Sequence, residues 1–290
     1  MDNFRLPVGD IASDAVDWVV ANLSAVFDWL RVVFVGMYDG VNWMLSEPAA
    51  LTIIVIIGVL GLLARGLVFG LLSVAGLFLI VAMDQWDNAM STLALVLVAA
   101  SLAILLGIPL GIASAKVRWV SYIVKPVMDF LQTMPAFVYL IPALLLFRVG
   151  VAPGIVATIV FAMAPGVRLT ELGIRGVDSE TVEAGQSFGA TPMRILRQIQ
   201  LPLALPSIMA GVNQVIMLSL SMVVIAGLVG AGGLGGDVIA SLNRLDTALG
   251  VEAGLSVVIL AMILDRFTGA FGQRRGLYNW LRTKAGHARA

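Results

Sequence analysis

The one long polar stretch within this apolar sequence lies between Pro165 and Pro202. Its charged residues are balanced in sign: Arg168, Glu171, Arg175, Asp178, Glu180, Glu183, Arg194 and Arg197. Such a mixture indicates neither a basic lipid-binding tail nor a disordered acidic segment. This loop is therefore the first place in the chain where side-chain chemistry could serve a contact or a mechanism.

Helix-capping residues divide the loop into two short helices. Asp178 or Ser179 can cap the first, and acidic residues follow in its first turns, where the helix dipole favours anions. Gly189 can end it, and Thr191 followed by Pro192 is typical of a cap and first helical residue. We expect two helices of about 10 residues, each about 15 Å long and too short to cross a membrane or fold alone. Such a unit needs a partner surface, on its own bundle or on another protein.

Few other residues could carry catalysis or bind a cofactor. The chain has no Cys, its only His is His287, and none of its three lysines lies in a P-loop. Gly230 to Gly235 satisfies G-x-G-x-x-G but follows an apolar helical segment instead of a strand, so we expect an external gate loop or a close-packed turn. We expect no catalytic residue, no metal site, no nucleic acid partner and no cofactor on this chain.

Composition places most of the chain in lipid. Of the 290 residues, 60% are hydrophobic and 12% are charged, about half the charged fraction of a soluble domain, and the mean hydropathy is +0.99. We expect an all-α membrane protein with about seven transmembrane helices, a count that follows from a hydrocarbon core about 30 Å thick. The expected spans are roughly 49–64, 66–83, 88–113, 130–147, 151–165, 203–228 and 250–267, with a turn at Arg65-Gly66 between the first two.

The basic residues predict the orientation. An outside N-terminus and a cytoplasmic C-terminus leave only Arg5, Arg31, Arg148 and Arg244 outside, and put 14 of the 18 basic residues in the cytoplasm, as the positive-inside rule requires. Four regions are expected: an external amphipathic segment (1–48) with Trp18 and Trp29 at the interface, two accessory helices (49–87), a five-helix core (88–270) with the polar loop (166–202), and a cytoplasmic tail (271–290). The amphipathic helix could brace the bundle or dock a partner.

The loop also carries a family resemblance. Glu183-Ala184-Gly185, then Gly189, then Ile199-Gln200-Leu201-Pro202 resembles the cytoplasmic signature of ABC importer permeases of the binding-protein-dependent type, with a MetI-like type I fold. Gly185 stands where the signature has Ala. The segments Gln132 to Tyr139, Phe188 to Pro192 and Leu218 to Gly235 look like the glycine betaine/proline/choline branch, and the resemblance covers about residues 88–270.

The resemblance implies that the loop is a coupling helix seated in a groove of a separate ATPase, which holds ATP and Mg. The implied coupling residues are Glu183, Ala184, Gly185, Phe188, Gly189, Thr191, Pro192 and Met193. Glu183 would hold the loop by charge-assisted hydrogen bonds, and Phe188 and Met193 would be apolar anchors. It also implies a permease homodimer in a bacterial inner membrane, crossing it several times, and an external substrate-binding protein.

The implied activity is uptake of glycine betaine or a related quaternary-ammonium solute, with choline, proline or carnitine as alternatives. Aromatic faces can hold such cations, and the candidate residues along the path are Thr133, Tyr139, Asn213, Ser219 and Met222. A secondary transporter or channel would instead need carboxylates inside the membrane, and the expected spans hold almost none. A scaffold without transport would tolerate substitutions in the loop.

Overall fold

The computed structural model describes residues 7–272, and every regular element in that range is helical. The first part of the chain holds α1 (Val8–Ser46), α2 (Ala50–Arg65), α3 (Leu67–Ala82), α4 (Trp86–Lys116), α5 (Arg118–Thr133) and α6 (Ala136–Phe147). The second part holds α7 (Val151–Arg175), α8 (Ser179–Ser187), α9 (Pro192–Ile195), a π turn η1 (Leu196–Gln200), α10 (Leu201–Ala226), a 3₁₀ turn η2 (Gly227–Val229), α11 (Gly233–Arg244) and α12 (Thr247–Gly272). Most of the predicted tail, 273–290, and His287 within it lie outside the described residues.

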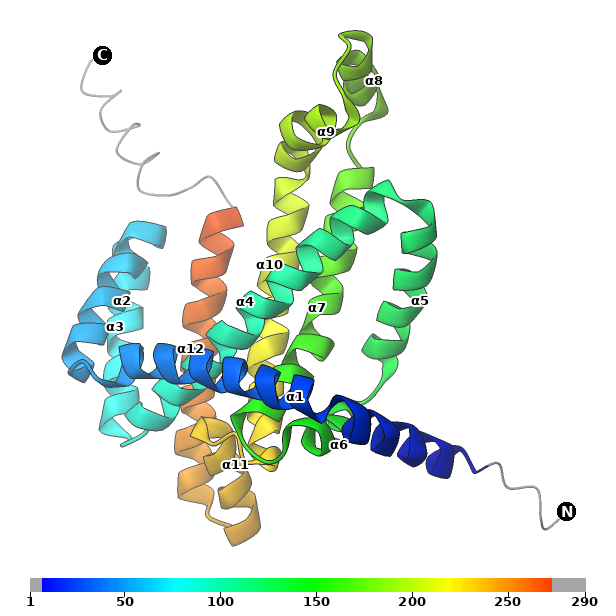
Figure 1. Cartoon of the computed structure of the whole chain (residues 1–290). Helices are drawn as coiled ribbons and strands as arrows, with labels where there is room; N and C mark the ends of the chain where they lie inside the picture. Colours follow the sequence, from blue (N-terminus) through cyan, green and yellow to red (C-terminus); the bar gives the residue numbers. More distant parts are fainter. Residues whose placement is uncertain (1–6, 273–290) are drawn as a thin grey trace, which may run out of the picture.

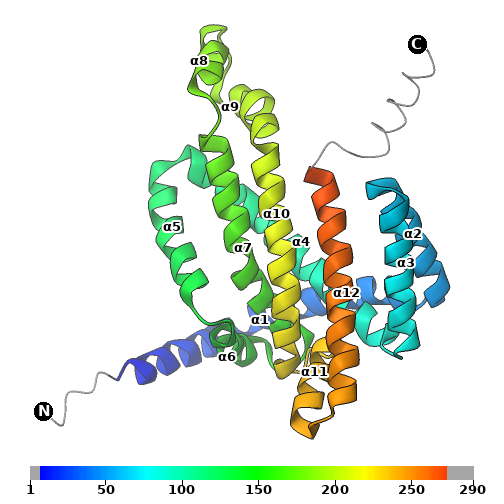
Figure 2. The same ribbon diagram turned by 180° about the vertical axis from the view of Figure 1, so that it is seen from behind.

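Helix α7 packs against both α4 and α10 at the centre of the bundle (Figures 1 and 2). Glycines permit this close approach: a β-carbon on Gly111 of α4 would lie 2.6 Å from the carbonyl oxygen of Val167, and one on Gly173 of α7 would lie 2.7 Å from Cβ of Ser207. Small residues commonly let membrane helices approach in this way. The main apolar core is built here, from α4, α6, α7 and α10.

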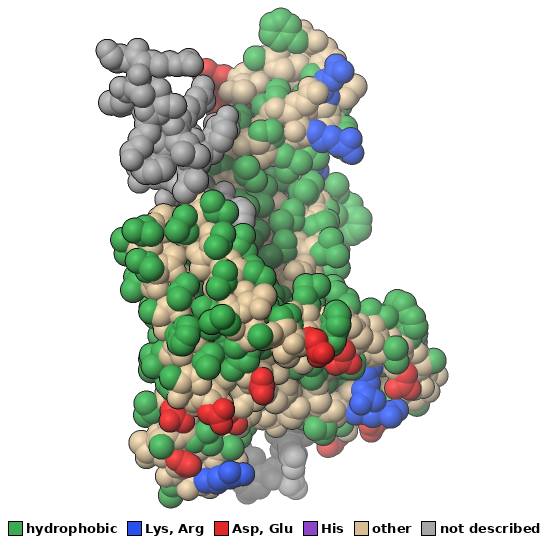
Figure 3. Space-filling view, turned by 90° about the vertical axis from the view of Figure 1, so that its left-hand side faces the viewer, with side chains coloured by type: hydrophobic (Ala, Val, Ile, Leu, Met, Phe, Trp, Pro, Cys, Tyr) green, Lys and Arg blue, Asp and Glu red, His purple; other side chains and the backbone are tan. Residues whose placement is uncertain are grey.

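Five described helices are long and apolar enough to cross a membrane, or six if the bent pair α5 and α6 counts as one span. Helices α2 and α3 have 16 residues each and are about 24 Å long. The predicted turn between them is present at Gly66, whose φ of +92° suits glycine. Figure 3 shows apolar side chains over the middle of the face that includes this hairpin, with charged side chains gathered toward its two ends.

The predicted single span at 130–147 is wrong, because the chain breaks inside it. Helices α5 and α6 meet at an angle of 103°, and Met134 between them is extended, with ψ of 135°. Proline disfavours helical geometry in the residue before it, so Pro135 fixes this break. The chain crosses the bundle along α5, and α6 lies at the end opposite to α8 (Figure 1).

The predicted span 151–165 is also too short. Helix α7 continues through Pro165 to Arg175, so Arg168, Glu171 and Arg175 belong to a long helix and not to the polar loop. A proline inside a helix removes one hydrogen bond and crowds the carbonyl four residues before it, yet α7 stays helical through Pro165 where it packs between α4 and α10. The loop itself is confined to 176–191.

Helix α1 runs across the bundle instead of along it (Figures 1 and 2). Phe27 and Phe34 both pack on Phe147 at the end of α6, with ring centroids 5.4 Å and 6.1 Å apart. Asp28 forms an ion pair with Arg148 at 3.2 Å. These contacts brace α6 from outside the bundle, although α1 also passes the length and hydropathy test for a span.

Candidate functional site

The polar loop folds as its capping residues predict. The Asp178 carboxylate accepts a hydrogen bond from the backbone N–H of Glu180 at 3.0 Å, and α8 runs from Ser179 to Ser187. Gly189 follows with φ of +77°. The Thr191 hydroxyl accepts from the backbone N–H of Arg194 at 3.4 Å, which caps α9. Both caps and the glycine elbow are therefore confirmed.

The predicted second helix of the loop is not separate. Helix α9 is a single turn that continues through the π turn η1 into α10, so one helix extends from Pro192 to Val229. Pro202, at the end of the predicted polar loop, therefore lies inside a continuous helix. A π turn widens the helix immediately before this proline, where an ordinary turn would clash with its ring.

Helix α8 protrudes beyond the ends of α7 and α10 (Figure 2), and none of its residues is buried. Its inner side rests on α9 and η1, where a β-carbon on Gly185 would meet Ile199 and Ile195. Glu183 and Ala184 are exposed on α8. Two apolar side chains near them also face solvent: Phe188 is 92% exposed and Met193 is 55% exposed. The hairpin therefore carries an apolar surface with no partner among residues 7–272.

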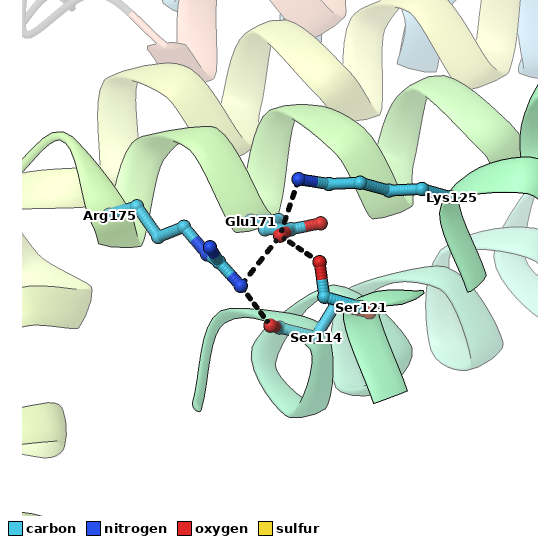
Figure 4. Close-up of polar contacts among 5 residues, drawn as sticks. All are labelled: Ser114, Ser121, Lys125, Glu171 and Arg175. Carbon is cyan, nitrogen blue, oxygen red and sulfur yellow. Dashed lines mark hydrogen bonds and ion pairs between the residues drawn. The ribbon is translucent and has the colours of Figure 1, made fainter. Parts of the chain in front are cut away.

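A buried charge cluster, absent from the sequence-based candidates, lies just below this hairpin (Figure 4). Glu171 on α7 is 3% exposed. One of its carboxylate oxygens lies 3.0 Å from Nη2 of Arg175 and 3.4 Å from Nζ of Lys125 on α5, and it accepts a hydrogen bond from Ser121 at 2.8 Å. Arg175 also donates to the carbonyl oxygen of Ser114 in α4 at 2.8 Å. Four-residue spacing of Glu171 and Arg175 was the only sequence signal for it.

Carboxylates are more frequent on the long helices than the sequence analysis expected. Glu171 lies on α7, Asp129 on α5 pairs with Arg168 of α7, and Asp265 on α12 accepts a hydrogen bond from Asn213 at 3.2 Å. Each one has a basic or amide partner within the chain, and Glu171, the buried one of the three, needs such compensation.

The predicted path residues do not converge on one site. Tyr139 and Met222 lie in the same buried core, where the tyrosine hydroxyl donates to the carbonyl oxygen of Leu131. Asn213 joins α10 to α12 through Asp265 and Thr268. The Ser219 hydroxyl is buried and has no hydrogen-bond partner within 7–272. The Thr133 hydroxyl is exposed at the end of α5 and donates to the carbonyl oxygen of Phe130 at 3.0 Å.

The glycine-rich segment forms a close-packed turn, one of the two predicted possibilities. It follows η2 and begins α11, so the chain before it is helical. A β-carbon on Gly227 would lie 2.3 Å from the backbone of Gly235. The N–H of Leu234 donates to the Thr92 hydroxyl of α4 at 2.8 Å.

These features define a helical membrane protein with a broken span and an exposed polar hairpin at one end. Residues 107–276 match the family described as binding-protein-dependent transport system inner membrane component, and the chain belongs to that family.

Relatives extend the similarity to nearly the whole chain. The glycine betaine/carnitine transport permease protein GbuB of Listeria monocytogenes is 47% identical over 93% of this chain and 96% of its own length. The glycine betaine/proline betaine transport system permease protein ProW of Escherichia coli is 43% identical over 96% of this chain and 79% of its own. The glycine betaine transport system permease protein OpuAB of Bacillus subtilis is 42% identical over 91% of this chain and 94% of its own length.

The fold is also found among solved structures. An inward-facing conformation of the MetNI methionine ABC transporter has a chain that superposes with a TM-score of 0.57 at 24% identity, covering 65% of this chain and 94% of that one. This likeness concerns the fold.

Proposed function

We propose that this chain is the permease subunit of an ABC importer for glycine betaine or a related quaternary-ammonium solute. Its relatives GbuB, ProW and OpuAB are named for glycine betaine, with proline betaine or carnitine beside it in two of the names. Choline and proline are the other candidates, and choline appears in the names of more distant relatives. ATP and Mg bind to a separate ATPase subunit.

The observation that carries this proposal is the exposed α8 hairpin. Its side chains Phe188 and Met193 project from the bundle, and apolar residues of this kind are typical centres of protein interfaces. A groove on the ATPase covers them. Glu183 holds the loop by charge-assisted hydrogen bonds, Ala184 and Gly185 allow close backbone approach, Gly189 supplies the turn, and Thr191-Pro192 caps the helix that follows. ATP-driven closure of the ATPase pair then moves α8.

The arrangement of helix ends supports the predicted topology, with an outside N-terminus and a cytoplasmic C-terminus. It has seven spans when α2, α3 and α5 are counted as spans and α1 is not. The turn at Gly66 and the last residues described in α4, α7 and α12 lie toward the α8 end of the bundle, and α1, α6 and α11 lie toward the other (Figure 1). In this orientation α1 lies along the outer surface, where its exposed residues Trp18 and Trp29 suit the membrane interface.

The permease is proposed to act as a homodimer that receives solute from an external binding protein. Exposed apolar side chains of α5 and α6, among them Phe130, Phe137 and Ile141, offer a surface for the second copy. Tyr139 and Met222 would lie nearest the path, with Thr133, Asn213 and Ser219 as further candidates, and a tyrosine face can attract a quaternary ammonium group.

Uptake into vesicles tests this function. The permease is reconstituted with its ATPase and binding protein, and uptake of radiolabelled glycine betaine, choline, proline and carnitine is measured with and without internal ATP. We expect uptake only with ATP and the binding protein, and competition that ranks glycine betaine first. Uptake that needs no ATPase and collapses with an ionophore would establish a secondary transporter, and normal uptake by variants of the loop would exclude a coupling role.

A further inference from the structure

The buried carboxylate of Glu171 joins three helices at the base of the α8 hairpin. Its partners come from α5 (Ser121 and Lys125) and α7 (Arg175), and Arg175 reaches the carbonyl oxygen of Ser114 in the last turn of α4 (Figure 4). A carboxylate removed from water is stable only when its charge is compensated by partners of this kind. The cluster thus forms a joint, in which Glu171 and its partners hold the ends of α4, α5 and α7 together.

Only a short segment of the chain connects the cluster to α8. Arg175 is the last residue of α7, and only residues 176–178 separate it from the first residue of α8. One of these, Asp178, is held by its cap on α8. Any displacement of α8 would therefore be passed to Arg175 through only three residues.

Helix α5 is the element that this joint can move. One side of α5 packs on α7 through Val124 and Met128, whereas Tyr122 and Phe130 on other sides are exposed. Its polar ties to α7 are the ion pairs Lys125–Glu171 and Asp129–Arg168, and the hydrogen bond from Ser121 to Glu171. At its far end α5 meets the 103° bend into α6, which carries Tyr139.

We propose that Glu171 is a positioning residue that transmits movement of α8 to α5 and to the bend between α5 and α6, and so couples ATP hydrolysis to solute passage. The inference rests on the proposed function. It predicts that a chain without this charge still binds its ATPase and hydrolyses ATP, but moves less solute per ATP.

The test measures uptake and ATP hydrolysis side by side in vesicles that contain the complete transporter. Glu171→Gln keeps the size of the side chain and an oxygen that can accept from Ser121, so it removes mainly the charge. We expect the ratio of uptake to hydrolysis to fall about tenfold, which corresponds to the loss of charged hydrogen bonds in a buried site. Glu171→Asp keeps the charge, and the long side chains of Lys125 and Arg175 can follow it, so the ratio is largely restored.

Glu47→Gln makes the same chemical change at an exposed residue between α1 and α2, and serves as the matched control with an unchanged ratio. A merely structural role for Glu171 would reduce the amount of assembled transporter but leave the ratio per assembled complex intact. An unchanged ratio in Glu171→Gln therefore overturns the inference.

Lys125→Gln decides the matter if Glu171→Gln does not assemble. The Lys125 side chain is about half exposed, so the substitution does not leave a cavity, and a fall in the same ratio supports the joint whereas no change overturns it. A wild-type transporter with ATP-driven uptake and a fully coupled Glu171→Gln would overturn only this inference. A wild-type transporter without ATP-driven uptake would overturn the proposed function as well.

Discussion

Gly185 of α8 lies directly against Ile199 of the π turn, so that a β-carbon at residue 185 would come within 2.6 Å of Cδ1 of Ile199. This contact fixes the angle at which the hairpin folds back on the start of the long helix. It also explains how alanine, which the family signature has at this position, fits the same backbone: the conflicting atom is the end of a flexible side chain.

We therefore expect Gly185→Ala to retain most uptake, because Ile199 can change rotamer. Gly185→Val adds two further carbons and overpacks the contact, at a cost of about 1–3 kcal/mol. Uptake and co-purification with the ATPase should both fall in Gly185→Val. Equal loss in the two variants would contradict this account of the contact.

Gly189 holds the elbow of the hairpin with φ of +77°, and no neighbour would block a side chain there. The obstacle to substitution is backbone strain alone, about 1–2 kcal/mol for most residues. Gly189→Val should lose uptake while the protein still inserts into the membrane. Asparagine tolerates this conformation better, so Gly189→Asn should keep measurable uptake. Higher uptake by Gly189→Val than by Gly189→Asn would exclude backbone strain as the cause.

Loss of the Asp178 cap should loosen α8 without affecting the bundle. Asp178→Ala removes the acceptor for the N–H of Glu180, at a cost of about 1 kcal/mol. Hydrogen exchange should become faster for the amides of α8 and stay unchanged for those of α10. Asp178→Asn retains a side-chain acceptor and provides the control.

Phe188 should contribute to ATPase binding and not to permease stability, since its side chain is 92% exposed. Phe188→Ala is expected to weaken association with the ATPase by about 2 kcal/mol if it is an interface anchor, with an unchanged melting temperature for the isolated permease. Leu245→Ala offers a matched comparison, because Leu245 is 89% exposed and follows α11 at the other end of the bundle. Binding titrations that show equal affinity for both variants would remove Phe188 from the interface.

The sequence predicted the caps and the elbow of the hairpin because these signals are local. A helix cap such as Asp178 or Thr191 accepts a hydrogen bond from an N–H two or three residues away. The residue types at neighbouring positions are therefore sufficient to predict the cap. The turn at Gly66 and the close packing of the Gly230 to Gly235 segment are local in the same sense.

The effect of each proline and the existence of the charge cluster could be recognised only from the tertiary structure. Pro135 breaks a span, whereas Pro165 lies inside α7 and Pro202 follows a π turn, and only packing partners distinguish these cases. The bond between Ser121 and Glu171 joins residues 50 positions apart. No periodicity within either segment reveals that pairing.

The continuity of the helix from Pro192 to Val229 has a mechanical consequence. Its 38 residues span about 57 Å. One tip forms the part of the hairpin that follows Gly189, and at the other tip Gly227 lies against Gly235. If the ATPase binds the hairpin as proposed, a force at Thr191-Pro192 would reach the turn at Gly227 along one continuous helix, without passing through a loop. The hairpin that is proposed to contact the ATPase and the close-packed glycine turn are therefore the two ends of one helix.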